Sequence, residues 1–69
     1  MTQTERVVEY IKEFGSITPL EALRDLGIMR LGARIFELRA EGYPIRSEMV
    51  SVKNRFGGMT KIAKYSMEV

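Results

Sequence analysis

The 69-residue sequence predicts an α+β fold, in which three short helices precede a two-stranded β-hairpin. Two capping boxes, each with threonine followed three residues later by glutamate, predict where the first two helices begin. After Gly42 the hydrophobic period changes from about 3.6 to about 2 residues, which predicts strands. A chain of this length has room for one hydrophobic core, so we expect a single domain over residues 1–69.

The first helix is expected over residues 3–14. Thr2 and Glu5 have the spacing of a capping box, and Gly15 is placed to end the helix in a left-handed conformation. The segment 16–17 that follows is long enough only for a short strand stub. The apolar residues that recur at helical spacing are Val7, Val8, Tyr10, Ile11 and Phe14.

The second helix is expected to begin at Pro19, after a second capping box formed by Thr18 and Glu21. Proline suits the first helical position because its missing N–H would have no partner there. Gly27 is expected to end this helix after about two turns. Its apolar face is expected to contain Leu20, Leu23 and Leu26.

The third helix is expected from Met29 or Arg30 to Glu41, since Gly42 ends it and Pro44 prevents its continuation. On a helical wheel one side gathers the apolar residues Ile28, Leu31, Ile35 and Leu38, and this side is expected to face the other helices. The opposite side carries small and charged residues: Met29, Arg30, Ala33, Glu37, Ala40 and Glu41, with Arg34 and Phe36 on its borders. Small alanines beside an arginine suit close approach to another surface.

The hairpin is expected between residues 45 and 69. In the second strand Ala63, Tyr65, Met67 and Val69 alternate with more polar positions, which predicts one buried face. The run 45–52 is branched and apolar but loses its alternation near Met49-Val50, which predicts a bulge. The segment 54–58, Asn-Arg-Phe-Gly-Gly, predicts the turn and gives the hairpin a basic tip.

This order of elements is that of a winged helix-turn-helix domain, whose third helix enters the major groove of DNA while the hairpin contacts the flanking backbone or the minor groove. The sequence also resembles the small winged helix-turn-helix domain proteins of bacteriophages and prophages. The resemblance covers nearly the whole chain and is carried by the runs Ser16–Ala22, Leu26–Ile28, Arg30–Arg39, Gly42–Ile45 and Ala63–Tyr65. It implies a winged-helix fold, a phage or prophage source and DNA binding.

Charge is distributed unevenly along the chain. Residues 1–29 carry three basic and five acidic side chains, whereas residues 30–69 carry eight basic and four acidic ones. This asymmetry suits one basic face, although chance clustering on a solvated surface would produce it equally well. We expect DNA contacts from the third helix and the hairpin, at Met29, Arg30, Ala33, Arg34, Lys53, Arg55 and Lys61.

For several of these basic residues a structural role is an alternative to DNA contact. A guanidinium at Arg30 can pair with guanine O6 and N7 or with a phosphate. Arg34 suits the same contact or a salt bridge to Glu37 or Glu41. Arg39 falls on the core side of the wheel, so we interpret it as structural. Lys64 is interpreted as an ordinary strand lysine.

Several function classes are disfavoured by composition. The chain has no cysteine and no histidine, and no nucleophile–base spacing or phosphate loop stands out, so we expect no enzyme, no cofactor and no metal. No apolar run approaches the roughly 18 residues of a membrane span, and the start carries no signal region, so the cytoplasm is the expected location, the host's if the chain is phage-encoded.

Two function classes stay open. The leading one is a DNA-binding transcriptional regulator, expected to act on double-stranded DNA as a homodimer because one winged helix buries only roughly 600 to 1,000 Å². The alternative is a protein-interaction module, such as an inhibitor of a host defence or polymerase complex. The net charge of only +2, the outward Glu37 and Glu41 and the apolar hairpin tip favour this alternative a little.

Overall fold

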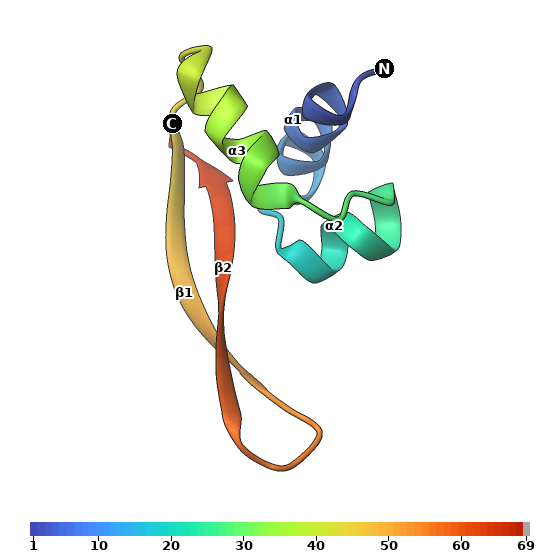
Figure 1. Cartoon of the computed structure of the whole chain (residues 1–69). Coiled ribbons are helices and arrows are strands. Elements are labelled where there is room, and N and C mark those ends of the chain that lie inside the picture. The colour runs from blue at the N-terminus through green and yellow to red at the C-terminus, as the bar shows by residue number, and fades with distance from the viewer. Residues whose placement is uncertain (69) are drawn as a thin grey trace.

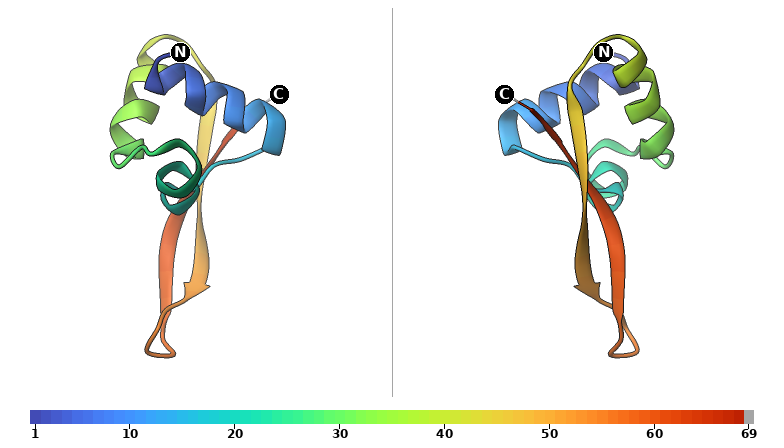
Figure 2. Two further views of the ribbon diagram at one scale, coloured as in Figure 1. Left: turned by 90° about the vertical axis from the view of Figure 1, so that its right-hand side faces the viewer. Right: turned by 90° about the vertical axis from the view of Figure 1, so that its left-hand side faces the viewer.

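The computed structural model describes residues 1–68 and confirms the expected α+β fold (Figure 1). The elements are, in order, α1 (Gln3–Phe14), α2 (Pro19–Leu26), α3 (Leu31–Ala40), β1 (Ile45–Lys53) and β2 (Met59–Met67). The helices cluster at one end, and the antiparallel hairpin of β1 and β2 projects away from them (Figures 1 and 2). The molecule is therefore elongated, with extents of 38 × 24 × 21 Å.

Both capping boxes form as predicted. The Thr2 hydroxyl accepts from the Glu5 N–H, and the Thr2 N–H donates to Glu5 Oε1 at 2.9 Å. Thr18 and Glu21 make the equivalent pair of bonds. Gly15 ends α1 in the left-handed region, at φ +90°. The bounds of α1 and α2 therefore agree with those expected from the sequence.

The core is built where the helices meet the base of the hairpin. Its most completely buried large side chains lie in α1, in α3 and in the segments on either side of α2: Val7, Ile17, Ile28, Ile35 and Leu38. The hairpin contributes the buried Ile45 and the partly buried Tyr65 and Met67. Ile17 forms the expected strand stub, since its N–H and C=O each bond to the backbone of Tyr65 at 2.9 Å. This short bridge fixes β2 against the helices.

The expected apolar face of α2 is wrong for Leu20 and Leu23, whereas Leu26 packs against the core as predicted. Leu20 and Leu23 are 63% and 49% exposed, whereas Ala22 is fully buried and Leu26 is half-buried. The two turns of α2 lie against α1, α3 and β2, and the methyl group of Ala22 fits on its fully buried side, whereas the larger Leu20 and Leu23 lie outside it. Phe14, the last residue of α1, is also exposed, at 63%, and its ring packs against the ring of Tyr10 at a centroid distance of 4.6 Å.

The third helix is shorter than expected at both ends. Arg30 is the residue before the helix, with φ −115° and ψ 63°, and Glu41 is the residue after it. The expected bounds placed both residues inside the helix, and sequence signals locate a helix end only to within one or two residues. The burial of Ile28, Leu31, Ile35 and Leu38 is as predicted.

The bulge expected near Met49-Val50 is wrong, because the register runs unbroken from Ile45↔Met67 to Lys53↔Met59. The alternation is lost for a different reason. Near Ile45 one face of the hairpin packs on the core, whereas Val50 is half-buried on the other face, which borders a hollow beside the start of α2. The expected single buried face of the second strand is wrong for the same reason, since residues 62–67 are all half-buried. Val69 lies outside the described residues.

Candidate nucleic-acid interface

A tight turn between α2 and α3 fixes the direction of the third helix. Gly27 is left-handed at φ +69°, and its N–H donates to Leu23 O at 3.1 Å. The next residue, Ile28, donates to Ala22 O at 3.0 Å and buries its side chain. Because the turn is held by backbone bonds on one side and by a core residue on the other, α3 is set rigidly against α2.

The outward side of α3 combines one arginine with apolar side chains. Arg30 is exposed at the start of the helix, and within residues 1–68 no hydrogen bond or ion pair holds its guanidinium. Ala33 is half-buried, while Met29 and Phe36 are 84% and 75% exposed. Phe36 was expected only at the border of this side, so its exposure was underestimated from the wheel.

Arg34 is engaged within the protein. Its Nε lies 2.6 Å from Glu37 Oε1, and its Nη1 donates to Gln3 Oε1 at 3.0 Å. The Nε contact lacks the angles of a hydrogen bond, so it is an ion pair. Of the two salt-bridge partners considered for Arg34, the structure selects Glu37. The ion pair reduces the positive charge of α3. Arg30, just before the helix, is therefore the arginine on this side whose guanidinium is unpaired within residues 1–68.

Arg39 has the structural role that the wheel indicated. Its Nε donates to the backbone oxygen of Ile45 at 3.0 Å, which ties the end of α3 to the start of β1. Arg46, one residue along β1, is exposed and was not considered as a contact. The signal that identifies it is its alternation with the buried Ile45.

The distal half of the hairpin carries the other candidates. Lys53, Arg55 and Lys61 are exposed, and no ion pair holds them within the part of the chain that the structure describes. Lys64 is half-buried and lies directly across the ladder from Glu48, which suits the structural interpretation of this lysine. The hairpin thus presents three cations beyond the helices.

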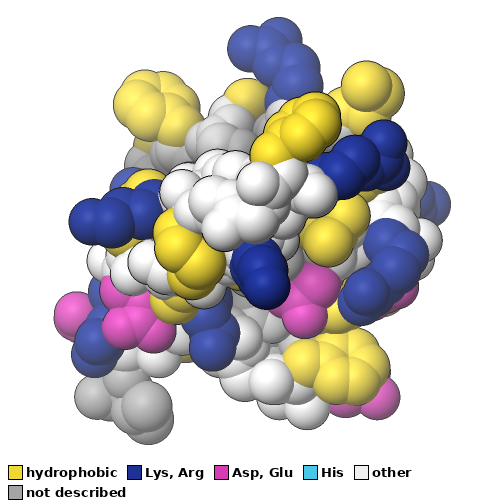
Figure 3. Space-filling model, turned by 90° about the horizontal axis from the view of Figure 1, so that it is seen from below, with side chains coloured by type: hydrophobic (Ala, Val, Ile, Leu, Met, Phe, Trp, Pro, Cys, Tyr) yellow, Lys and Arg dark blue, Asp and Glu magenta, His cyan; other side chains and the backbone are white. Residues whose placement is uncertain are grey.

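Viewed along the hairpin from its tip, the surface is mixed and not uniformly basic. Lysine and arginine side chains surround the end of the molecule, with hydrophobic groups and some acidic groups between them (Figure 3). A uniform positive band would have favoured DNA over a protein partner. Instead, separate lysine and arginine side chains lie among hydrophobic side chains, so this surface by itself is compatible with either partner.

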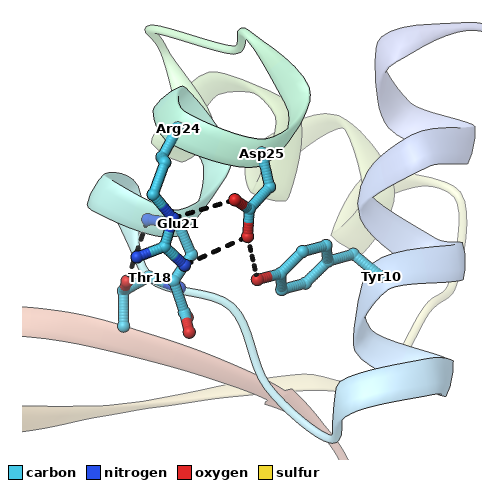
Figure 4. A network of polar contacts seen from close by, with 5 residues as sticks. All are labelled: Tyr10, Thr18, Glu21, Arg24 and Asp25. Atoms are coloured by element: carbon cyan, nitrogen blue, oxygen red, sulfur yellow. Dashed lines mark hydrogen bonds and ion pairs between the residues drawn. The ribbon is translucent and has the colours of Figure 1, made fainter.

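A polar network joins α1 to α2 (Figure 4). The Tyr10 hydroxyl donates to Asp25 Oδ2 at 2.6 Å, and Arg24 donates to both oxygens of Asp25, at 2.8 and 3.1 Å. Hydrogen bonds from Arg24 and then from Tyr10 lower the pKa of Asp25 to about 2. The bond to this carboxylate raises the pKa of Tyr10. The network orients α2 against α1. Because the tight turn at Gly27 follows directly after α2, the network also helps to position α3.

Residues 1–68 contain neither a cluster of metal ligands nor a helix that could span a membrane. No cluster of three or more potential metal ligands occurs within residues 1–68. In the same part of the chain, no helix has both the length and the hydropathy to cross a bilayer.

Comparison with known proteins identifies one family. A family model described as a winged helix-turn-helix domain matches residues 2–69. No curated protein and no solved structure matches the chain.

Proposed function

We propose that this chain, which belongs to the winged helix-turn-helix domain family, binds double-stranded DNA through α3 and the β1–β2 hairpin. The observation that carries the proposal is the placement of the free cations. The start of α3, with Arg30, lies on the side of the helical cluster from which the hairpin projects, and the hairpin carries Lys53, Arg55 and Lys61 (Figure 1). A duplex approaching this side meets cations from both elements.

The two elements are suited to different contacts. Arg30 stands at the exposed start of α3, from which a guanidinium reaches base edges or phosphates in the major groove. Ala33 has only a methyl group on the outward side of α3, and Gly32 has no side chain. These small residues leave room for the helix to approach DNA closely. The hairpin cations suit phosphates, and each such contact releases counterions. Arg34 is proposed as a weaker contributor because Glu37 neutralises it.

The biological role is a further part of the proposal. Its support is the resemblance to small phage and prophage proteins, which favours a transcriptional regulator of a bacteriophage or prophage that acts in the cytoplasm of the host. We propose that it acts as a homodimer, because one module of this size buries too little DNA surface for useful specificity.

A protein-interaction module is the second candidate function, for example an inhibitor of a host defence or polymerase complex. The observation that favours it is the exposure of Met29 and Phe36 on the outward side of α3. Large exposed side chains of this kind are typical of protein interfaces, and the Arg34–Glu37 pair removes charge from the same side.

The proposal is tested by titrating random and genomic duplex DNA with the protein at two salt concentrations. The Arg30→Ala, Arg55→Ala double variant is expected to bind more weakly and to lower the slope of log K against log salt by about 2, since each phosphate contact contributes about 0.9. If Arg30 reads a base edge, the variant also loses preference among sequences.

The matched control is the Arg6→Ala, Lys12→Ala double variant, which removes the same charge from exposed positions of α1. It is expected to keep most of the wild-type slope. Equal losses in both variants would show a nonspecific charge effect, and absence of wild-type binding at low salt would refute DNA binding and favour the protein-interaction function.

A further inference from the structure

Phe56, at the hairpin tip, is 93% exposed, more than any other large hydrophobic side chain in the described part of the chain. Single exposed apolar residues are common on protein surfaces and need no explanation by themselves. This one differs because the turn that carries it is built by several specific bonds, and because residues 51–60 are all exposed, so no other element covers it.

The tip is organised by Asn54. Its Oδ1 accepts from the N–H of Phe56 at 2.9 Å and from the N–H of Gly58 at 3.1 Å. Its Nδ2 also bonds to the Thr60 hydroxyl at 3.2 Å. One side chain therefore holds both arms of the turn, and this fixes the backbone on either side of Phe56.

Backbone bonds complete the turn. Asn54 N–H donates to Gly58 O at 2.8 Å, and Gly57 N–H donates to Asn54 O at 3.2 Å, with Gly57 left-handed at φ +84°. This is the pattern of a three-residue hairpin loop closed by a left-handed glycine. Phe56 is thus presented at the end of a stiff loop and does not fold back on the hairpin.

The hairpin gives this side chain reach. Nine residue pairs separate the tip from the base, and at about 3.3 Å per residue the ladder spans roughly 26 Å. The distal part projects clear of the helices (Figure 2). An extension of this kind can enter a groove while the helices remain on the adjoining face of a duplex.

The charges beside Phe56 match a nucleic-acid backbone. Lys53, Arg55 and Lys61 lie at or near the tip, and no acidic residue occurs between Met49 and Met67. An apolar wedge flanked by cations is the arrangement with which minor-groove proteins separate base steps, because the cations bind the phosphates on both sides of the inserted group.

From this geometry we infer that Phe56 inserts between base pairs from the minor groove and bends the duplex. The inference rests on the proposed DNA binding and specifies its mechanism. Insertion unstacks one base step, which is least costly at flexible pyrimidine–purine steps such as TA. The protein is therefore expected to favour duplexes with a TA step where the hairpin tip lies.

The experiment measures bending and unstacking separately from binding. A duplex with a central TA step carries donor and acceptor dyes at its ends, and a second copy carries 2-aminopurine at that step. The full-length wild-type protein is expected to raise energy transfer, consistent with a bend of about 20 to 90°, and to raise 2-aminopurine fluorescence.

Two variants isolate the wedge. Phe56→Ala keeps every charge, so it is expected to keep the salt slope but to lose the bend and the fluorescence increase. Phe56→Leu retains an apolar wedge and is expected to restore a measurable part of both signals. Thermal unfolding of each variant checks that the hairpin and core remain folded, which is expected because position 56 contacts no buried residue.

The outcomes are distinguishable from those of the proposed function. Wild-type binding without bending or unstacking overturns the wedge while DNA binding stands. Bending that persists in Phe56→Ala also overturns it. Absence of any DNA binding removes both proposals. If the wild type instead binds phosphatidylserine–phosphatidylcholine vesicles through Phe56 and leaves the duplex unbent, the tip is a membrane anchor and the inference is wrong.

Discussion

Two glycines beside the turn between α2 and α3 provide a sharp test of how backbone conformation determines stability. At both Gly27 and Gly32 a Cβ atom would meet no side chain or distant backbone atom within 4 Å. The two sites differ in conformation, since Gly27 is left-handed at φ +69° whereas Gly32 is the second residue of α3. The same change to alanine should therefore have opposite effects.

The magnitudes follow from that difference. Gly32→Ala removes unfolded-state freedom and is expected to stabilise the fold by about 0.5 kcal/mol, the lower part of the helix-interior range, because the site lies in the first turn. Gly27→Ala forces an L-residue into the left-handed region, which costs roughly 1 to 2 kcal/mol. For a chain of this length the total stability is roughly 3 to 10 kcal/mol, so both changes are measurable.

The assay is thermal unfolding followed by circular dichroism. With about 4 to 8 °C per kcal/mol for a domain of this size, Gly32→Ala is expected to raise Tm by about 2 to 4 °C and Gly27→Ala to lower it by about 4 to 16 °C. Shifts of the same sign would refute the reasoning, since the surroundings of the two sites are equally open and only the backbone conformation differs.

Two further predictions concern charged groups. Folding lowers the pKa of Asp25 from 3.8 to about 2. The ionised Asp25 carboxylate therefore stabilises the fold fully above pH 3.8, and this stabilisation is lost as the pH falls towards 2. Asp25→Asn should therefore unfold at a lower temperature than wild type at neutral pH, and this gap should shrink on acidification; a gap independent of pH would contradict the assigned bonds from Tyr10 and Arg24. Glu37→Gln removes an acid from the outward side of α3 and frees Arg34, so DNA affinity should rise about two- to fivefold, equivalent to roughly 0.5 to 1 kcal/mol, in a binding titration. Unchanged or weaker binding would count against α3 as the DNA-facing helix.

The candidate site was only partly accessible to sequence reasoning. The exposed positions of Arg30, Lys53, Arg55 and Lys61 agree with what the wheel and the turn indicated. Arg34 donates its hydrogen bond to Gln3 Oε1, which is 31 residues away and on another helix. No spacing rule within α3 could have identified that partner.

Burial was predicted well for α3 and poorly for the shorter α2, although each packs against three other elements. The third helix buries the apolar residues that the wheel selected. In α2 a single fully buried alanine marks the contact, and the leucines beside it are exposed. Hydrophobicity ranks side chains by their preference for burial, but the spacing between two packed helices determines which size fits.

The sequence by itself determined the bounds of α1 and α2, the tight turn after Gly27 and the position of the hairpin loop. Each depends on bonds between residues within a few positions of one another, such as the capping boxes and the bonds of Asn54. The tertiary structure alone decided which face of the hairpin is covered near its base and which near its middle, why its register continues through Met49-Val50, and that Arg34 also bonds to Gln3 of α1. These features depend on elements that are distant in the chain, and their contacts exist only once the helices and the hairpin have packed together.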